Sequence, residues 1–273
     1  MSSFIMEKED SDLLSVSCIR SFLSNPIRAG QIVVYSVLES TNTTALEMAA
    51  SGAAHGTVVI ANSQTAGRGR RGRFFYSPSG RGIYMSVVLR PKLLPFNSPE
   101  LVTIFAAVAV CKTIELISIE QEASDSPNWR NLRIKWVNDI FLNGKKICGI
   151  LTEVAHDTIV VGIGINFTAP SGGYPKELDS IPGALFEMNH VPISKSQFIA
   201  DIINHLDCPP TSTQILKDYK ERLIMLDRAI IVHDYNSSYM ATALDVDDTG
   251  GLIVRNTEGK IQTLVAGEIS ITF

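Results

Sequence analysis

The chain has 273 residues, of which 45% are hydrophobic and 19% charged, so it can bury a substantial core as one large or two smaller globular domains. Its formal net charge of -4 argues against binding nucleic acid through overall positive charge, and its longest apolar run, residues 101 to 111, is shorter than the roughly 20 residues of a membrane helix. The first 30 residues lack the pattern of a secretory signal or a transit peptide, which predicts a cytoplasmic protein.

The cysteines and histidines predict neither a metal centre nor a redox pair. Cys18, Cys111, Cys148 and Cys208 lie far apart, without the close pairs that zinc or dithiol chemistry needs, and each is expected to be a small buried side chain. The histidines have no metal-ligand spacing either, so no metal-binding residue is predicted.

Helices and strands alternate in the first half of the chain. Helical spacing of apolar residues predicts a helix over 9 to 23, and "STNTTALEMAA", residues 40 to 50, opens with residues that can cap a second one. A third, longer helix is predicted to start at "SPEL", where Ser98 is a cap and Pro99 the first helical residue. Runs rich in β-branched residues predict strands over 31 to 37, 57 to 62 and 83 to 89.

The second half predicts the centre of a sheet, two helices and a small β domain. After a polar connection at 120 to 131, three short apolar runs follow, at 132 to 136, 146 to 153 and 158 to 167. Helices are expected over 194 to 207, where Ser194 and Gln197 suit a capping box, and over 212 to 226. From residue 227 onward there is no helical stretch, but "DTGG" and "TEGK" are hairpin signals. The prediction is an α+β protein with domains at 1–226 and 227–273.

Four arginines and three glycines alternate in "GRGRRGR", residues 67 to 73, which we call the arginine loop. The segment fits G-x-G-x-x-G, but a dinucleotide-binding turn must open a helix, and here an aromatic, turn-like segment and a strand follow. Glycines expose backbone N–H groups and guanidinium groups match phosphate or carboxylate oxygens, so the loop suits a polyanion. It is expected to be mobile until an anion binds. A solvated charged loop explains the run equally well.

Four further clusters stand near the ends of predicted strands. They are "ESTN" at 39 to 42, "KWVND" at 135 to 139, "GKKICGILTE" at 144 to 153 and "GIGIN" at 162 to 166. Taken singly, each has a simple structural explanation: a helix cap, a turn, a hairpin with exposed lysines, and glycines at a close backbone approach.

Together and in this order, these motifs and the arginine loop resemble the biotin protein ligases, also called holocarboxylase synthetases. The resemblance runs from about residue 30 to 166 and continues weakly through "GGLIV" and "GEIS" near the C-terminus. Val137 stands where that family usually has proline, which removes a fixed φ angle but no chemical group. Too few residues precede the first strand for a helix-turn-helix, so the resemblance is to the form without an N-terminal DNA-binding domain.

The resemblance implies a fold and a reaction. The fold is a mixed β-sheet flanked by helices, like the catalytic domain of class II aminoacyl-tRNA synthetases, with a small C-terminal Src-homology-3-like β-barrel. The reaction converts biotin and ATP, with Mg²⁺, to biotinyl-5′-AMP and pyrophosphate, and then transfers biotin to a lysine of a biotin carboxyl carrier domain. No DNA or membrane partner is implied, and a homodimer is left open.

Site residues follow from the same resemblance. Arg70 and Lys146 are expected to lie between the carboxylate of biotin and the α-phosphate of ATP, with Lys145 as the alternative to Lys146. Asp139 is expected to deprotonate or orient the attacking lysine, and its alternative role is to form a turn. The implied biotin-binding set is Ser40, Thr41, Asn42, Gln64, Gly67, Arg68, Gly69, Arg70, Trp136 and Lys146. The implied nucleotide-binding set is Arg68, Arg70, Arg71, Arg73, Asn138, Gly164 and Asn166. The implied catalytic set is Arg70, Lys146 and Asp139.

Two other functions compete with this interpretation. Lipoate protein ligases share the fold type and the adenylation chemistry, but "SGG" at 171 to 173 lacks the arginines and third glycine of their usual R-R-x-S-G-G-G segment. A nucleic-acid-binding module would use the arginines on phosphates, and net acidity and the absence of an aromatic platform count against it.

Overall fold

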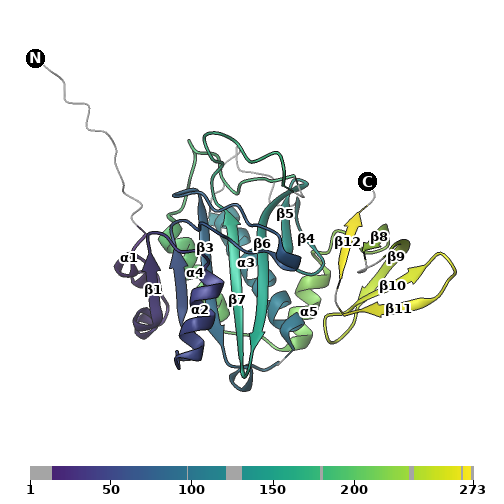
Figure 1. Ribbon diagram of the computed structural model, residues 1–273, viewed down its shortest axis with the longest axis horizontal. Coiled ribbons are helices and arrows are strands. Elements are labelled where there is room, and N and C mark those ends of the chain that lie inside the picture. The colour runs from purple at the N-terminus through teal and green to yellow at the C-terminus, as the bar shows by residue number, and fades with distance from the viewer. Residues whose placement is uncertain are drawn as a thin grey trace, which may run out of the picture.

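Two sheets, one of seven and one of five strands, form the frame of the computed structural model, which describes residues 14–96, 98–120, 131–178, 181–233, 237–265 and 267–271 (Figure 1). The strands of the larger sheet are β1 (Ile32–Tyr35), β2 (Val58–Ala61), β3 (Gly82–Leu89), β4 (Leu132–Lys135), β5 (Asp139–Leu142), β6 (Lys145–Ala155) and β7 (Thr158–Asn166). Their order is β1-β2-β3-β7-β6-β5-β4, and only β1 and β2 pair in parallel, so the sheet is mixed.

Helices cover both faces of this sheet. They are α1 (Val16–Arg20), α2 (Thr41–Ala50), α3 (Pro99–Glu120), α4 (Lys195–Leu206) and α5 (Ser212–Lys220). On one face, Ala45 and Ala49 of α2 pack over β2, β3 and β7 (Figure 1). On the other face, α3 lies between the sheet and the layer formed by α4 and α5. Because α3 is covered on both sides, its own residues are apolar around the whole helix. No described helix has the length and apolarity to span a membrane.

The smaller sheet is antiparallel and packs beside the larger one. Its strands are β8 (Ala229–His233), β9 (Ser238–Val246), β10 (Leu252–Asn256), β11 (Ile261–Leu264) and β12 (Glu268–Ile271), in the order β11-β10-β9-β8-β12. The two predicted hairpins join β9 to β10 and β10 to β11. Trp136 Nε1 donates a hydrogen bond to Gly250 O (3.0 Å), so the first hairpin is bound to the end of β4.

The structure confirms the α+β class and the mixed sheet, but it corrects two elements. "KWVND" does not end in a turn alone, because Asp139 begins β5, whose hairpin with β6 turns at Asn143 and Gly144, both with positive φ. Helix α5 ends at Lys220 rather than at 226, because the chain then pairs with β4: Arg222 O accepts from Ile134 N–H (2.8 Å), and Ile134 O from Ile224 N–H (3.0 Å).

Other expectations are met only in part. The helix predicted over 9 to 23 is observed as Val16–Arg20, and residues 9 to 13 lie outside the described residues, as does most of the 120 to 131 connection. Cys111 and Cys148 are buried as expected, whereas Cys18 and Cys208 are exposed. The proposed domain boundary after residue 226 falls between α5 and β8 and stays a prediction.

Candidate active site

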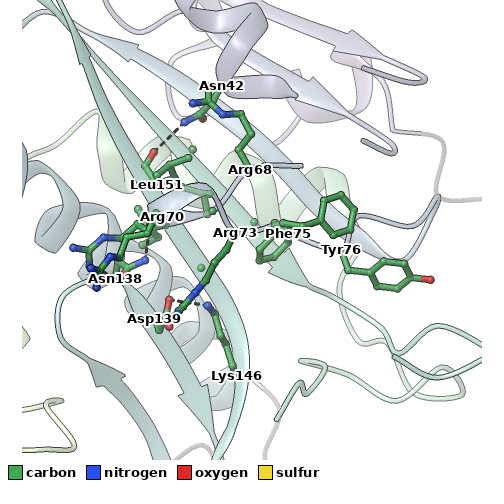
Figure 2. A pocket seen from close by; sticks show the side chains of 18 of the residues that line it. Asn42, Arg68, Arg70, Arg73, Phe75, Tyr76, Asn138, Asp139, Lys146 and Leu151 are labelled. Atoms are coloured by element: carbon green, nitrogen blue, oxygen red, sulfur yellow. Dashed lines mark hydrogen bonds and ion pairs between the residues drawn. The ribbon is translucent and has the colours of Figure 1, made fainter. Parts of the chain in front are cut away.

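A cavity of about 160 Å³ brings together all five sequence motifs (Figure 2). Its walls come from the start of α2, the arginine loop, strands β4 to β7, the residues Tyr174, Leu178 and Pro182, and residues 267 and 268 near and in β12. Every residue of the expected biotin, nucleotide and catalytic sets lines it except Gly67. Gly67 lies directly behind the wall, where a Cβ would be 2.4 Å from Phe75 O and 2.6 Å from Ser77 Oγ.

One end of the cavity is polar but uncharged. Gln64 Oε1 accepts from the Thr41 backbone N–H (2.8 Å), and Gln64 Nε2 donates to Ser77 Oγ (2.8 Å). Ser40 is the N-cap residue of α2, yet its hydroxyl makes no capping hydrogen bond. Since Ser40 and Thr41 are buried at the cavity wall, this end suits a neutral ligand group with both donors and acceptors.

Arg70 and Lys146 mark the cationic part of the cavity. Arg70 donates from Nη1 to Asn138 Oδ1 (3.0 Å) and from Nη2 to Gly267 O (3.1 Å), while Lys146 Nζ lies 2.9 Å from Asp139 Oδ1 (Figure 2). The latter contact is an ion pair without good hydrogen-bond alignment. Burial lowers the pKa of Arg70 below its usual value, although nearby Asp139 opposes this. Lys145 is exposed and does not line the cavity, which favours Lys146 over its rival.

The arginine loop is folded as an irregular hairpin. Arg73 O accepts from Gly69 N–H (2.8 Å), and Gly67 O from Phe75 N–H (2.8 Å). A 3-10 turn spans Arg70–Gly72 at the tip, with Arg71 in the left-handed region at φ 57°. Two carboxylates hold the loop from opposite sides: Glu153 pairs with Arg68 at 2.7 Å, and Glu268 binds both Nη atoms of Arg73 at 2.6 Å. The loop therefore bridges the two sheets.

A pair of glycines forms another part of the cavity lining. Gly149 of β6 and Gly164 of β7 face each other in register, and the ring of Phe75 lies over both. A Cβ at Gly164 would lie 2.6 Å from Phe75 Cε1, and one at Gly149 would lie 3.3 Å from Phe75 Cε2. The Phe75 ring therefore occupies the space over these glycines, and a side chain at position 164 would collide with it.

Comparison with known proteins decides the family. The model described as Biotin/lipoate A/B protein ligase family matches residues 34–167, and the model of the Biotin protein ligase C terminal domain matches residues 226–271. The bifunctional ligase/repressor BirA of Bacillus subtilis (strain 168) is 32% identical, over 94% of this chain and 79% of that protein. The chain belongs to the biotin protein ligase family. With that family it belongs to the ATP-dependent ligases.

Further relatives agree in extent and fold. A Mycobacterium tuberculosis protein named biotin--[acetyl-CoA-carboxylase] ligase is 28% identical, over 92% of this chain and 94% of its own length. The structure of a biotin protein ligase from Aquifex aeolicus in complex with biotin and ATP superposes with a TM-score of 0.71 at 22% identity, over 88% of this chain and 98% of that one. The shared fold includes the small C-terminal domain of Src-homology-3-like type.

Several side chains that line this cavity or pair with its lining residues were missed by sequence reasoning. Phe75 directly follows the arginine loop, Lys135 opens "KWVND", Glu153 closes "GKKICGILTE", and Glu268 lies within "GEIS", so each stood beside or inside a recognised motif. Tyr174 lines the cavity from a segment that carries no recognised motif, and nothing in the sequence indicated it.

Lys135 differs from the other basic side chains lining the ligase cavity. Burial lowers the pKa of the Lys135 ammonium group below its usual value, and the negative charges of Asp139 and Glu268 oppose this shift only in part. Arg68, Arg70, Arg73 and Lys146 all have polar side-chain partners, whereas the side chain of Lys135 makes neither a hydrogen bond nor an ion pair within the described ranges. Its ammonium group is therefore available to an anionic ligand.

Three of the expected site residues also have structural partners. Trp136 is 3% exposed and bonded to Gly250, which gives it a place in the core that both sheets share. Asn166 Nδ2 donates to Gly183 O (2.9 Å), and Asn138 Nδ2 donates to Ile150 O (2.8 Å). Their direct contact with biotin or nucleotide stays a prediction.

Mg²⁺, which the family resemblance implies, has no dedicated cage in the described part of the chain. No group of three metal-ligating side chains occurs there, and the carboxylates lining the cavity, Asp139 and Glu268, are paired with basic side chains. Mg²⁺ is bound in many nucleotide sites chiefly through phosphates and water, with one or two carboxylates. The donor set therefore fits an ion that arrives with ATP.

Proposed function

We propose that the protein joins biotin to AMP, releasing pyrophosphate from ATP, and then transfers biotin to a lysine of a carboxyl carrier domain. The observation that carries this proposal is the combination of surfaces that line the cavity: neutral polar side chains, the Phe75 ring over two glycines, and the cationic pair Arg70 and Lys146. Biotin has three matching parts, a ureido group, an apolar bicycle and chain, and a carboxylate.

In the first step, a carboxylate oxygen attacks the α-phosphorus and pyrophosphate leaves. The two reactants are both anions, so cations must hold them together and stabilise charge in the transition state. Arg70 and Lys146 take this position, and Asn138 and Asp139 orient them. Arg68, Arg71, Arg73, Lys135, Gly164 and Asn166 line the nucleotide side. Mg²⁺ bound by the phosphates would neutralise the charge of the departing pyrophosphate.

At the polar end, Ser40, Thr41 and Gln64 bind the ureido group together with backbone groups near Gly67. A site built around such partners rejects analogues that lack them, because its buried donors and acceptors would be left unpaired. Phe75 packs against the bicycle over Gly164.

In the second step, the amine of the carrier lysine attacks the carbonyl carbon of the mixed anhydride, an amide forms and AMP leaves. The amine must first lose a proton, since its reference pKa is about 10.4. We assign this task to Asp139, which also pairs with Lys146. The name of the Mycobacterium tuberculosis relative supports the carrier domain of a biotin-dependent carboxylase as acceptor. We propose the cytoplasm as the place of reaction.

The decisive experiment is ATP–pyrophosphate exchange with biotin, with lipoate and without acid, followed by mass spectrometry of a biotin carrier domain incubated with protein, biotin and Mg-ATP. We expect exchange with biotin only and one added biotinyl group. Arg70→Ala should reduce both signals at least about 100-fold, since a charged contact at the reacting centre is lost. Exchange with lipoate but not biotin would overturn the proposal.

Asp139→Asn separates the two steps. Transfer from preformed biotinyl-5′-AMP should slow by about 10- to 100-fold, the usual weight of general-base catalysis, while adenylate formation falls less. Equal loss in both steps would remove the base role and leave Asp139 as the partner of Lys146.

A further inference from the structure

A chain of four polar side chains runs from the cavity wall, which Asn42 and Arg68 line, to Ser86 and Glu153 behind it. Ser86 Oγ lies 2.6 Å from Asn42 Oδ1, Asn42 Nδ2 donates to Glu153 Oε2 (2.9 Å) and to Leu151 O (3.2 Å), and Glu153 Oε1 accepts from Arg68 Nη2 (2.7 Å). The chain connects β3, α2, β6 and the arginine loop. Figure 2 shows Asn42 and Arg68 on the same side of the cavity, with Asn42 directed toward Leu151.

The sheet is locally shaped to admit the Asn42 amide. All eight residues of β3 are buried, and Ser86, at 0% exposure, is a polar residue among mainly apolar ones. Gly162 pairs with Ser86 in register, and a Cβ at Gly162 would lie 2.1 Å from Asn42 Oδ1. A hydroxyl and an amide buried in this way cost free energy unless each is hydrogen-bonded.

The direction of the hydrogen bonds follows from the partners. Leu151 O and the Glu153 carboxylate can only accept, so they fix Nδ2 of Asn42 toward β6 and leave Oδ1 facing Ser86. Oδ1 also can only accept, so Ser86 donates its single proton to it. Ser86 Oγ then accepts from Thr41 Oγ1, 2.8 Å away, which is closer than the alternative acceptor Gln64 Oε1 at 3.2 Å. Since its proton is used, Thr41 Oγ1 can then only accept further hydrogen bonds.

The other arm of the chain reaches a more exposed side chain. Arg68 is 45% exposed, and an isolated ion pair at such a site contributes little. Glu153 is 21% exposed and is already oriented by Asn42, so the guanidinium meets a fixed acceptor rather than a mobile one. Because Arg68 also bridges to Phe74 across the loop, fixing Arg68 fixes the base of the arginine loop.

Resting on the proposed function, we propose that Asn42 is a positioning residue, which acts through Ser86 to present Thr41 Oγ1 as a hydrogen-bond acceptor for a ureido N–H, and through Glu153 to anchor Arg68. Asn42 then has no direct contact with the ligand, because both of its amide protons are used by Leu151 and Glu153. The two ends of the bound adenylate, the ureido group and the loop over the phosphate, are thereby held by one network.

The Ser86 arm is tested by binding of biotin without ATP. Ser86→Ala removes the hydrogen bond that fixes the Thr41 side chain, so Thr41 Oγ1 is no longer held toward the ligand and biotin should bind about ten-fold more weakly, the usual cost of one hydrogen bond. A biotin analogue methylated at the ureido nitrogen should lose affinity for the wild-type protein but much less for Ser86→Ala. A merely structural role would weaken both ligands equally, and that result, or unchanged biotin binding, would overturn this arm.

The Glu153 arm is tested by release of biotinyl-5′-AMP from the complex. Glu153→Gln removes the charge that holds Arg68, so release should accelerate about ten-fold, with trypsin cleavage after Arg68 becoming faster in the free protein. In a double-mutant cycle with Arg68→Ala, the two effects should not add, since both remove one contact. Asp157→Asn, which breaks the exposed pair with Arg90 at 2.9 Å, is the matched control and should change neither rate. Additive effects would overturn the proposal.

Asn42→Asp, which places an oxygen opposite the Glu153 carboxylate, should reproduce both defects at once. If this variant does not fold, the Ser86→Ala and Glu153→Gln results decide. Failure of wild-type protein to bind biotin or catalyse exchange would instead refute the proposed function, whereas a normal wild type with unaffected variants would refute only the network.

Discussion

At the scale of single residues, the space above Gly164 decides whether the cavity can hold an apolar ligand. Gly164→Ala would place a Cβ 2.6 Å from the Phe75 ring, and the ring must then move toward the ligand. Overpacking of this kind costs roughly 1 to 3 kcal/mol, so we expect a lower melting temperature and a KM for biotin raised at least about ten-fold. Thermal denaturation and exchange kinetics measure these effects.

The double variant Gly164→Ala with Phe75→Leu should recover the melting temperature, because the smaller side chain leaves room for the new methyl group. Gly30→Ala is a suitable control, since nothing lies within 4 Å of a Cβ at that position. A melting temperature unchanged in Gly164→Ala would show that Phe75 is free to move and would remove the steric argument.

Lys135 is predicted to bind a phosphate of ATP. Its half-buried side chain has no hydrogen-bond or ion-pair partner in the part of the chain that the structure describes, so binding of an ATP phosphate would satisfy the ammonium group. Lys135→Met should raise the KM for ATP by about 10- to 100-fold, as expected for loss of a hydrogen bond to a charged group, and leave transfer from preformed adenylate nearly unchanged. Lys145→Met, at an exposed position, is the control; comparable losses in both variants would contradict this role.

Sequence reasoning grouped residues that line one cavity, but it did not predict which way each side chain points. Ser40, Thr41 and Asn42 are adjacent and were all assigned to biotin, yet the Asn42 amide bonds to Leu151 and Glu153. Which way each side chain points depends on Gly162, Ser86 and Glu153, which are 44 to 120 positions away in the sequence. A motif indicates that residues belong together, but only the folded chain shows which of them face inward.

At the scale of elements, the connection between α2 and β2 contains a pH-sensitive contact. His55 Nδ1 accepts from the backbone N–H of Arg90 (2.9 Å), which requires a ring without a proton on that atom. Burial lowers the pKa of His55, as do the charges of Arg28 and Arg90, while Asp207 opposes them. The unfolded chain therefore binds this proton more readily, and stability must fall as pH decreases below the ordinary histidine pKa of about 6.5.

His55→Asn keeps an acceptor near the Nδ1 position but does not titrate in this range. We expect the free energy of unfolding of the wild type to drop more between pH 7 and 5 than that of the variant, because only the wild type loses this contact when the ring is protonated. Urea unfolding at both pH values measures the difference. His156→Asn, at an exposed turn, should retain the wild-type slope, and a wild-type slope in His55→Asn as well would rule out this contact as the cause.

Elements with strong local patterns were predicted well, and those determined by pairing were not. Helix α3 begins where Ser98 and Pro99 predict, with Ser98 Oγ accepting from Leu101 N–H (3.1 Å). Strand β5 was missed because its four residues are too few for a periodic pattern, and its existence depends on β4 and β6 on either side. The segment after Lys220 was predicted as helix for the opposite reason, since its apolar residues suit a helix until β4 offers hydrogen bonds.

At the scale of the whole molecule, the arginine loop ties the small sheet to the site. Arg73 and Glu268 are 195 positions apart and share two hydrogen bonds of 2.6 Å, and the adjacent Gly267 O accepts from Arg70 (3.1 Å). Sequence reasoning could not pair them, because charge patterns carry no information on contacts between separate domains. The small sheet is thus not an appendix, since its last strand forms part of the cavity wall.

The strength of this contact should depend on pH in the acid range. Burial alone would raise the pKa of Glu268, but the hydrogen bonds and charge of Arg73, with the charge of Lys135, lower it below its usual value. A carboxylate with a lowered pKa stabilises the folded state above its unfolded pKa, and this contribution is lost as pH falls through the folded pKa. The pair should therefore contribute fully at pH 7 and progressively less below about pH 4.3.

Glu268→Gln tests the effect of this contact on stability and on ATP binding. At pH 7 we expect it to lower the free energy of unfolding by about 1 kcal/mol or less, because both side chains remain partly exposed, and to raise the KM for ATP as Arg70 and Arg73 lose their support. In urea unfolding the difference from the wild type should shrink between pH 5 and 3.5. Glu258→Gln, exposed in the β10–β11 turn, should change neither quantity. A stability difference that stays constant across that range would mean that the carboxylate charge does not hold the loop, and that backbone contacts such as Gly267 with Arg70 join the two sheets.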